Sequence, residues 1–266
     1  MKNDDSNVCI PKALRWLTCM SISLYLLGCN SAPTPESYDP EGSTITTAKE
    51  IKFQIRRTWR FQEINFTNQF AGARLSHVEK ENDTLFHLFI EPENAPINKS
   101  PWYGFGVWSD DPTQILGVLH YPNGYEHRYY PTQSYDSKTW LPIDSGLFSN
   151  DTIQHVASVT LNVGKDTLYI SAQPRFPSSH SYAWADSLTL SPEITSTTIG
   201  YSVLGQPIKR VQLGNPDANK AIVVLGRQHP PEVTGYLAMQ AFVARLLQED
   251  SLALEFRRQY SILLYP

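Results

Sequence analysis

The protein is a chain of 266 residues, of which 41% are hydrophobic and 18% are charged, with a formal net charge of −4. This composition is typical of a soluble globular protein of one or two domains, and its mild acidity argues against a nucleic-acid partner. All three cysteines, Cys9, Cys19 and Cys29, lie near the amino terminus. The rest of the chain therefore holds neither a disulfide framework nor a cysteine-based metal site.

Residues 1–28 are predicted to be a lipoprotein signal peptide. An apolar stretch from Trp16 to Leu27 is too short for an ordinary transmembrane helix. It ends in Leu26-Leu27-Gly28-Cys29, which resembles the bacterial lipobox. The resemblance implies that residues 1–28 are removed and that Cys29 is lipidated. The alternative is an ordinary signal peptide beside an incidental cysteine.

Residues 29–50 are predicted to be a flexible tether, because they are rich in Ser, Thr, Pro and Glu and contain little to bury. Acyl chains on Cys29 would anchor the protein to a membrane without spanning it. Asn30 provides no obvious inner-membrane retention signal. We therefore expect a location in the bacterial cell envelope, with the outer membrane or the periplasmic face favoured.

Residues 51–190 are predicted to form an antiparallel β-sandwich. Short apolar runs alternate with turn residues, which is the spacing of strands joined by hairpins. The best hairpin candidate is the turn Pro122-Asn123-Gly124. The predicted strands include Thr84–Ile90, Tyr103–Val107, Ile115–Leu119, Val156–Val163 and Asp166–Ser171.

The aromatic run from Pro101 to Trp108 has two interpretations. Exposed rings could form a platform for a sugar ligand. The alternation of Tyr103, Phe105 and Val107 with the two tryptophans is, however, the signature of a core strand, and we favour that interpretation. The histidines of this region show no convincing ligand spacing and are expected to be surface or core residues; they are His77, His87, His120, His127, His155 and His180.

Residues 191–266 are predicted to begin an α/β domain, after a short helix over Trp184–Leu188. The sequence indicates strands at Pro207–Leu213, Ala221–Leu225 and Tyr260–Tyr265, with an amphipathic helix over Thr234–Gln248. Strands that alternate with a helix are typical of a continuing α/β sheet. The expected fold class is α+β overall, a β-sandwich followed by the first part of an α/β domain.

A candidate metal site lies in Gly226–Val233, between a predicted buried strand and a predicted helix. His229 and Glu232 are three residues apart at this corner, so an imidazole nitrogen and carboxylate oxygens can reach one point in space. These donors suit a divalent metal, most plausibly Zn²⁺. The alternative is a glutamate that stabilises the start of the helix through the helix dipole, beside an incidental histidine.

The stretch Ile199–Ile208, followed by a strand, the Gly226–Glu232 corner and an apolar helix, resembles the opening of the zinc metallocarboxypeptidase family, the carboxypeptidase A-like peptidases. The His-Pro-x-Glu form behind a β-sandwich is most similar to the cytosolic-carboxypeptidase-like branch. The resemblance implies that His229 and Glu232 are the first two zinc ligands. It also implies a third histidine ligand, a glutamate base, a carbonyl-polarising arginine and substrate-binding groups, none of which can be assigned in this chain.

The resemblance leads us to expect a membrane-anchored zinc carboxypeptidase that removes C-terminal residues from peptides, or trims cell-wall peptides, by a zinc-activated water. We expect this chain to be truncated within the catalytic domain and inactive alone. One alternative is a ligand-binding β-sandwich lipoprotein with an inert α/β remnant. Another is a related zinc deacylase or amidohydrolase on the same scaffold.

Overall fold

The structure, a computed structural model, describes residues 53–92, 102–122, 124–153, 156–202, 204–229 and 231–266. Contacts divide the chain into two units, Met1–Ala48 and Lys49–Pro266, and all the described residues belong to the second. The predicted signal peptide, Cys29 and the tether up to residue 50 lie outside the described residues. None of the helices described is both long and apolar enough to cross a membrane.

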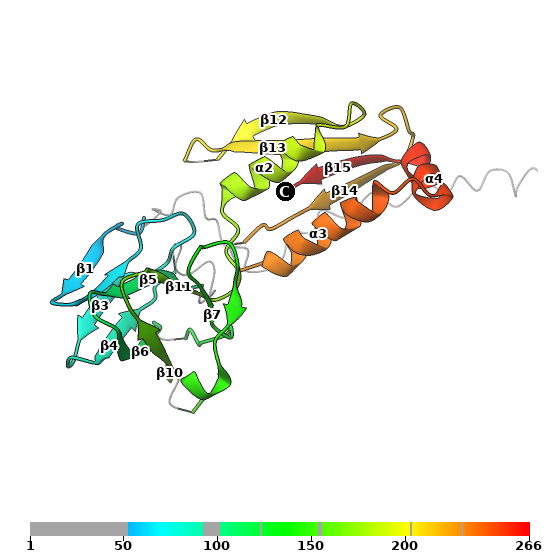
Figure 1. Ribbon diagram of the computed structural model, residues 1–266. Coiled ribbons are helices and arrows are strands. Elements are labelled where there is room, and N and C mark those ends of the chain that lie inside the picture. The colour runs from blue at the N-terminus through cyan, green and yellow to red at the C-terminus, as the bar shows by residue number, and fades with distance from the viewer. Residues whose placement is uncertain (1–52, 93–101, 123, 154–155, 203, 230) are drawn as a thin grey trace, which may run out of the picture. The chain divides into compact units, whose positions relative to one another are not determined.

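Residues 58–171 form two sheets with a shared core (Figure 1). The first sheet has the strand order β1-β2-β5-β11-β7-β8 and the second has the order β3-β4-β6-β10-β9. The strands of the first sheet are β1 (Thr58–Phe61), β2 (Ile64–Thr67), β5 (Gly104–Ser109), β7 (Thr132–Ser134), β8 (Leu141–Pro142) and β11 (Leu168–Ser171). Those of the second sheet are β3 (His77–Lys80), β4 (Leu85–Phe89), β6 (Thr113–His120), β9 (Phe148–Asp151) and β10 (Val156–Val163), with a short 3-10 turn, η1 (Ser145–Leu147), before β9.

Alternating side chains build the core of this sandwich. In β10, every second residue is buried, from Ala157 to Val163, as expected for a strand with one face in the core. The rings of Phe66, Phe86 and Phe105 meet between the sheets, with centroids 5.1 Å and 6.2 Å from Phe66. The sandwich that the sequence predicts is therefore present.

Two details of the predicted sandwich are wrong. First, it is not wholly antiparallel, because β4 and β6 pair in parallel. The chain passes through β5 of the other sheet between them, and a parallel pair requires such a crossover. Second, the Pro122–Gly124 turn does not join a hairpin, although Asn123 itself is outside the described residues. The flanking strands β6 and β7 belong to different sheets.

The aromatic run that leads into β5 is mostly core, as the favoured interpretation predicts, with Trp108 half-buried. Tyr103, Phe105 and Val107 are fully buried. Trp102 is also buried, and its indole N–H donates to the carbonyl oxygen of Gly72 at 3.0 Å. These side chains therefore do not form an exposed sugar platform.

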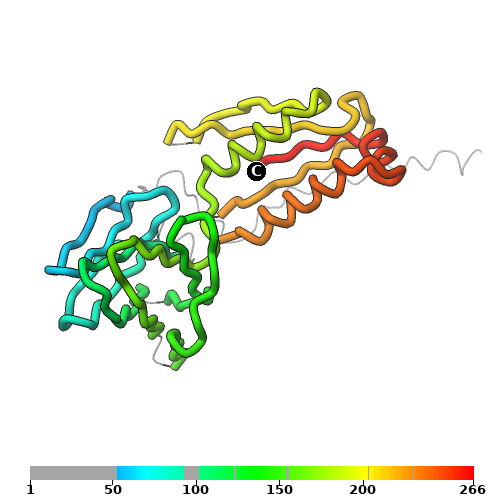
Figure 2. Tube along the Cα trace, in the orientation of Figure 1, coloured from blue at the N-terminus to red at the C-terminus, as the bar shows by residue number. Residues whose placement is uncertain are grey.

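The second part of the chain is a four-stranded sheet in the order β12-β13-β15-β14 with three helices (Figures 1 and 2). Only β14 and β15 are parallel, and the helical crossover α3–α4 connects them. The elements are α2 (Ser178–Leu188), β12 (Thr195–Tyr201), β13 (Pro207–Gly214), β14 (Ala221–Leu225), α3 (Val233–Leu246), α4 (Ser251–Gln259) and β15 (Ser261–Tyr265).

Most predicted elements of this part are confirmed, since β13, β14, α3 and β15 match their predicted ranges to within two residues. The helix predicted at Trp184–Leu188 begins earlier, at Ser178, and its Ala185 packs in the core of the α/β part. The strand β12 and the helix α4 were not predicted.

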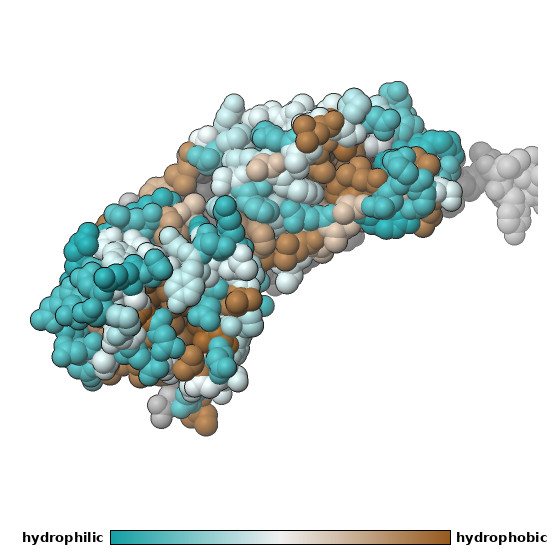
Figure 3. Space-filling view, viewed as in Figure 1, coloured by the Kyte–Doolittle hydropathy of each residue, from teal (hydrophilic) through white to brown (hydrophobic). Residues whose placement is uncertain are grey.

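One face of the four-stranded sheet is covered and the other is not. Val211, Leu213, Ile262 and Leu264 are buried beneath α2 and α3 (Figure 1). Hydrophobic residues remain visible between the helices on this face (Figure 3). On the opposite face of β14, Val223 and Leu225 are each 58% exposed. The edge strand β14 thus has one largely exposed face, whereas parallel strands are usually covered on both.

Candidate metal site

The predicted corner lies between the end of β14 at Leu225 and the start of α3 at Val233. Gly226 makes the tight exit from the strand, and its N–H donates to the carbonyl oxygen of Tyr265 at 2.7 Å. A Cβ atom at Gly226 would lie 3.1 Å from that oxygen and 2.9 Å from the Cε of Met239. The close approach of the strand to α3 therefore favours glycine at this position.

The structure brings His229 and Glu232 together. Nδ1 of His229 is 2.6 Å from Oε1 of Glu232, and the backbone N–H of His229 donates to Oε2 at 3.1 Å. The N–H of Glu232 in turn donates to the carbonyl oxygen of His229 at 3.1 Å, which closes the turn. Glu232 occupies the cap position of α3 but makes no side-chain cap hydrogen bond to the helix. Its carboxylate is therefore hydrogen-bonded to His229 and not to the N–H groups of the first helical turn.

Both side chains are accessible, with exposed fractions of 56% for His229 and 45% for Glu232. The hydrogen bonds from the side chain and then from the backbone of His229 lower the pKa of Glu232. The carboxylate is thus ionised at neutral pH and available as an anionic oxygen donor. An accessible imidazole beside an ionised carboxylate is a chemically suitable pair of ligands for Zn²⁺.

The donor set fits zinc in kind but not in number. A catalytic zinc usually has three protein ligands and one open position for water. Within the described ranges, no group of three or more His, Cys, Asp or Glu side chains is placed to hold a metal ion. We therefore derive no catalytic step through a metal from these residues.

The structure also joins two histidines whose spacing in the sequence gives no indication of a pair. Nδ1 of His87 on β4 is 2.7 Å from Nε2 of His120 on β6, and Nε2 of His87 is 2.7 Å from Oε2 of Glu81. The parallel pairing of β4 with β6 creates this contact between residues 33 positions apart. Local spacing therefore contained no signal for it, in contrast to the His229–Glu232 pair.

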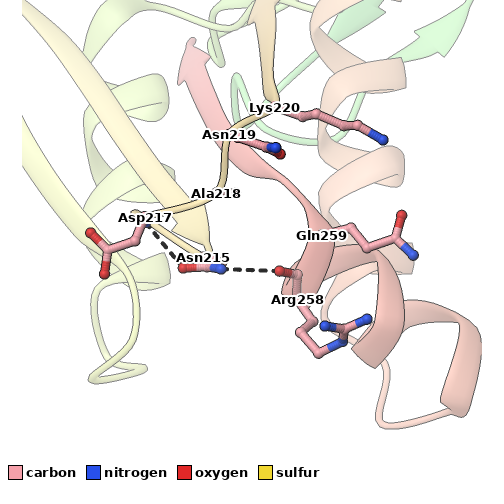
Figure 4. Close-up of a pocket in the computed structure, with 7 residues that line it drawn as sticks. All are labelled: Asn215, Asp217, Ala218, Asn219, Lys220, Arg258 and Gln259. Carbon is pink, nitrogen blue, oxygen red and sulfur yellow. Dashed lines mark hydrogen bonds between the residues drawn. The ribbon is translucent and has the colours of Figure 1, made fainter.

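An open polar notch lies at the other end of the parallel strands (Figure 4). The turn 215–220 before β14 and the residues Arg258 and Gln259 before β15 line it. The amide of Asn215 donates to the carbonyl oxygen of Arg258 at 3.1 Å and so ties the turn to α4. Ligands of open α/β sheets bind past the carboxyl ends of the strands, where His229 lies, so this notch is not part of the candidate site.

The corner lies in a part of the chain that matches a known protein family. Residues 181–266 match the family model described as zinc carboxypeptidase. This segment contains α3, β14, β15 and both candidate ligands. No curated protein sequence matches the chain significantly.

Solved structures share the fold over a longer range. A metallo-carboxypeptidase from Burkholderia cenocepacia has 17% identity and a TM-score of 0.63, covering 76% of this chain and 55% of that one. The metallo-carboxypeptidase from Pseudomonas aeruginosa, in complex with (2-guanidinoethylmercapto)succinic acid, has 16% identity and a TM-score of 0.62, covering 76% of this chain and 54% of that one. A structure from Shewanella denitrificans OS-217, described as a carboxypeptidase A, has 17% identity and a TM-score of 0.66, covering 76% of this chain and 54% of that one.

This coverage exceeds segment 181–266, so the similarity extends into the β-sandwich. It confirms the predicted α+β fold. The chain spans about half the length of these solved structures. The assignment to the cytosolic-carboxypeptidase-like branch stays a prediction.

Proposed function

We propose that this protein is a metallocarboxypeptidase whose first two zinc ligands are His229 and Glu232. The proposal starts from the match of residues 181–266 to the zinc carboxypeptidase family. The observation that carries the proposal is the contact between His229 and Glu232 at the β14–α3 corner, inside the family-matched segment. A zinc ion held there with a complete set of ligands would supply a polarised, nucleophilic water and a Lewis acid for the scissile carbonyl. The expected substrates are peptides that lose their C-terminal residue.

The side chains of this chain have limited roles in that proposal. Without metal, the 2.6 Å contact holds a ring nitrogen of His229 beside the ionised carboxylate of Glu232, and both groups would turn their donor atoms to a bound zinc in place of that hydrogen bond. No histidine follows His229 in the 266 residues. We assign no general base and no carboxylate-binding group. With two protein donors, we propose that the chain alone binds Zn²⁺ weakly and has negligible peptidase activity.

Zinc binding by matched variants tests the proposal. His229→Ala and Glu232→Gln each remove one donor, whereas His77→Ala disrupts another exposed His–Glu pair, in which Nε2 of His77 is 3.4 Å from Oε1 of Glu79. Competition against a chromophoric chelator should show one weak zinc site in the wild type and in His77→Ala. The site should be lost in the two corner variants. Equal zinc affinity in all four proteins would refute the assignment.

The other candidate functions are less well supported. The binding-module alternative needs exposed aromatic rings on the sandwich, and the rings of residues 102–108 are buried except that of Trp108, which is half-buried. A zinc deacylase or amidohydrolase would use the same two ligands, and no observation on the described residues favours it. Release of a C-terminal amino acid or of an acyl group by the metal-loaded protein would separate these activities.

The cellular location is proposed from the sequence only. The lipobox-like Leu26–Cys29 supports a lipid anchor on Cys29 and a place in the bacterial cell envelope, where peptides of the cell wall would be within reach. Incorporation of a labelled fatty acid in cells tests this directly. We expect labelling of the wild type and none of Cys29→Ala. Labelling that persists in the variant would overturn the proposal.

A further inference from the structure

The metal corner has few buried contacts of its own. The hydrogen bonds between His229 and Glu232 are solvent-exposed, and exposed ion pairs contribute little to stability. The corner nevertheless has to keep a particular turn between β14 and α3. Apart from the contacts of Gly226 with β15 and α3, the corner is attached to residues 102–176, which belong to the β-sandwich or to the segment that leaves it, and to the core of the sandwich.

The first attachment lies between the two ligands. The side-chain N–H of Gln173, two residues after the end of β11, donates to the carbonyl oxygen of Pro231 at 2.8 Å, and this contact is partly buried. Pro231 directly precedes Glu232. The hydrogen bond therefore fixes the backbone that orients the carboxylate.

Two further attachments flank the pair. Arg227, two residues before His229, donates to the carbonyl oxygen of Phe176, and its guanidinium lies 5.8 Å from the centre of the Trp102 ring. Val233, directly after Glu232, is 1% exposed and packs in the hydrophobic core of the sandwich. The corner is thus held before, between and after its two ligands.

We propose that the β-sandwich positions the zinc ligands, with Gln173 as the positioning residue whose side chain holds the His229–Glu232 turn. This inference rests on the proposed function. Every ligand that must be ordered on binding lowers the affinity, so a corner that is already held in place should bind the metal more tightly than a loose one. The role of the sandwich would then be to keep the corner ready for the metal.

The test replaces Gln173 by Met, which has a similar length but no N–H donor. Gln114→Met is the matched control, since Gln114 makes one side-chain hydrogen bond, to Asn162 at 2.9 Å, on the exposed face of the sandwich. Two quantities are measured for each protein: affinity for Zn²⁺ alone, and amide hydrogen exchange of Gln228, His229 and Glu232 without metal. Urea unfolding of each variant shows that the fold is retained.

Loss of one net hydrogen bond corresponds to about a fivefold change in an equilibrium. Gln173→Met should therefore bind zinc about fivefold more weakly and exchange its corner amides about fivefold faster, while Gln114→Met matches the wild type. Unchanged exchange at the corner would overturn the inference, and so would unchanged zinc affinity in a variant whose corner exchanges faster. If the wild type binds no zinc, the proposed function fails, and the exchange rates alone then decide whether Gln173 holds the corner.

Discussion

At the scale of single residues, the structure separates polar groups that are hydrogen-bonded and accessible from polar groups whose pKa is changed by burial. His229 and Glu232 are held by each other and remain accessible. His127 is the opposite case, because it is largely enclosed by aromatic rings. Its Nδ1 is 2.8 Å from the hydroxyl oxygen of Tyr121, and its buried Nε2 has no hydrogen-bond partner among the described residues. Burial lowers the pKa of His127 to about 4.

His127 should make stability depend on pH. The folded protein binds fewer protons at this site than the unfolded chain between pH 6.5 and pH 4, so the free energy of unfolding should fall as the pH is lowered through that window. The shift sets an upper limit of about 3 kcal/mol, which partial exposure reduces. Urea unfolding at pH 7 and pH 4.5 should show a smaller loss in His127→Phe than in the wild type. In the exposed control His77→Phe, the free energy of unfolding should fall between pH 7 and pH 4.5 by as much as in the wild type. If it also falls by that amount in His127→Phe, His127 is not the cause of the pH dependence.

Gly214 should be intolerant of a side chain. Its φ is +80°, and a Cβ atom would collide with the carbonyl oxygen of Tyr260. Gly214→Ala is expected to lower the free energy of unfolding by about 2 kcal/mol or more. Gly235, within α3, has open space around its Cα, so Gly235→Ala should raise it by about 0.5–1 kcal/mol. Chemical denaturation measures both, and the same sign of change in the two variants would contradict the account.

At the scale of elements, the sequence predicts helices and strands that have a strong local apolar pattern, but not the pairing of strands that are far apart in the chain. The helix α3 and the strand β14 have strong apolar patterns, and the corner between them joins residues three apart, so all three could be predicted. The strand β12 is mostly Thr, Ser and Gly and carries no such pattern. The parallel pairing of β4 with β6, and with it the His87–His120 contact, depends on a crossover through the other sheet. Sequence spacing cannot encode that pairing.

The unpredicted helix α4 begins at a side-chain cap. Oδ1 of Asp250 accepts hydrogen bonds from the N–H groups of Leu252 and Ala253, each at 3.1 Å, and Arg245 donates to the same carboxylate. Asp250→Ala removes the cap and should lower the urea midpoint. Asp250→Asn keeps an acceptor and should lose less, because the backbone N–H groups remain satisfied. Equal midpoints for the two variants would show that the cap does not stabilise α4.

At the scale of the whole molecule, the β-sandwich has a closed core, whereas the four-stranded sheet leaves one face open. Adjacent residues of β14 test this asymmetry. Val223 is 58% exposed, whereas Val224 is half-buried and packs against the core beneath the helices. Val223→Lys should hardly change stability and should reduce the binding of a hydrophobic dye. Val224→Lys should lower the free energy of unfolding by about 1–3 kcal/mol, because it places a charge on the half-buried face that packs against the helices. Equal destabilisation would mean that both faces are covered.

The central claim is that the β14–α3 corner is the zinc-binding element of this chain. A titration with Zn²⁺, followed by the ring signals of the seven ¹⁵N-labelled histidines, tests it most directly. The account predicts that the signals of His229 change first, and that those of His87 and His120 stay in place until His229 is saturated. Zinc-induced changes at His87 and His120 with no change at His229 would contradict it.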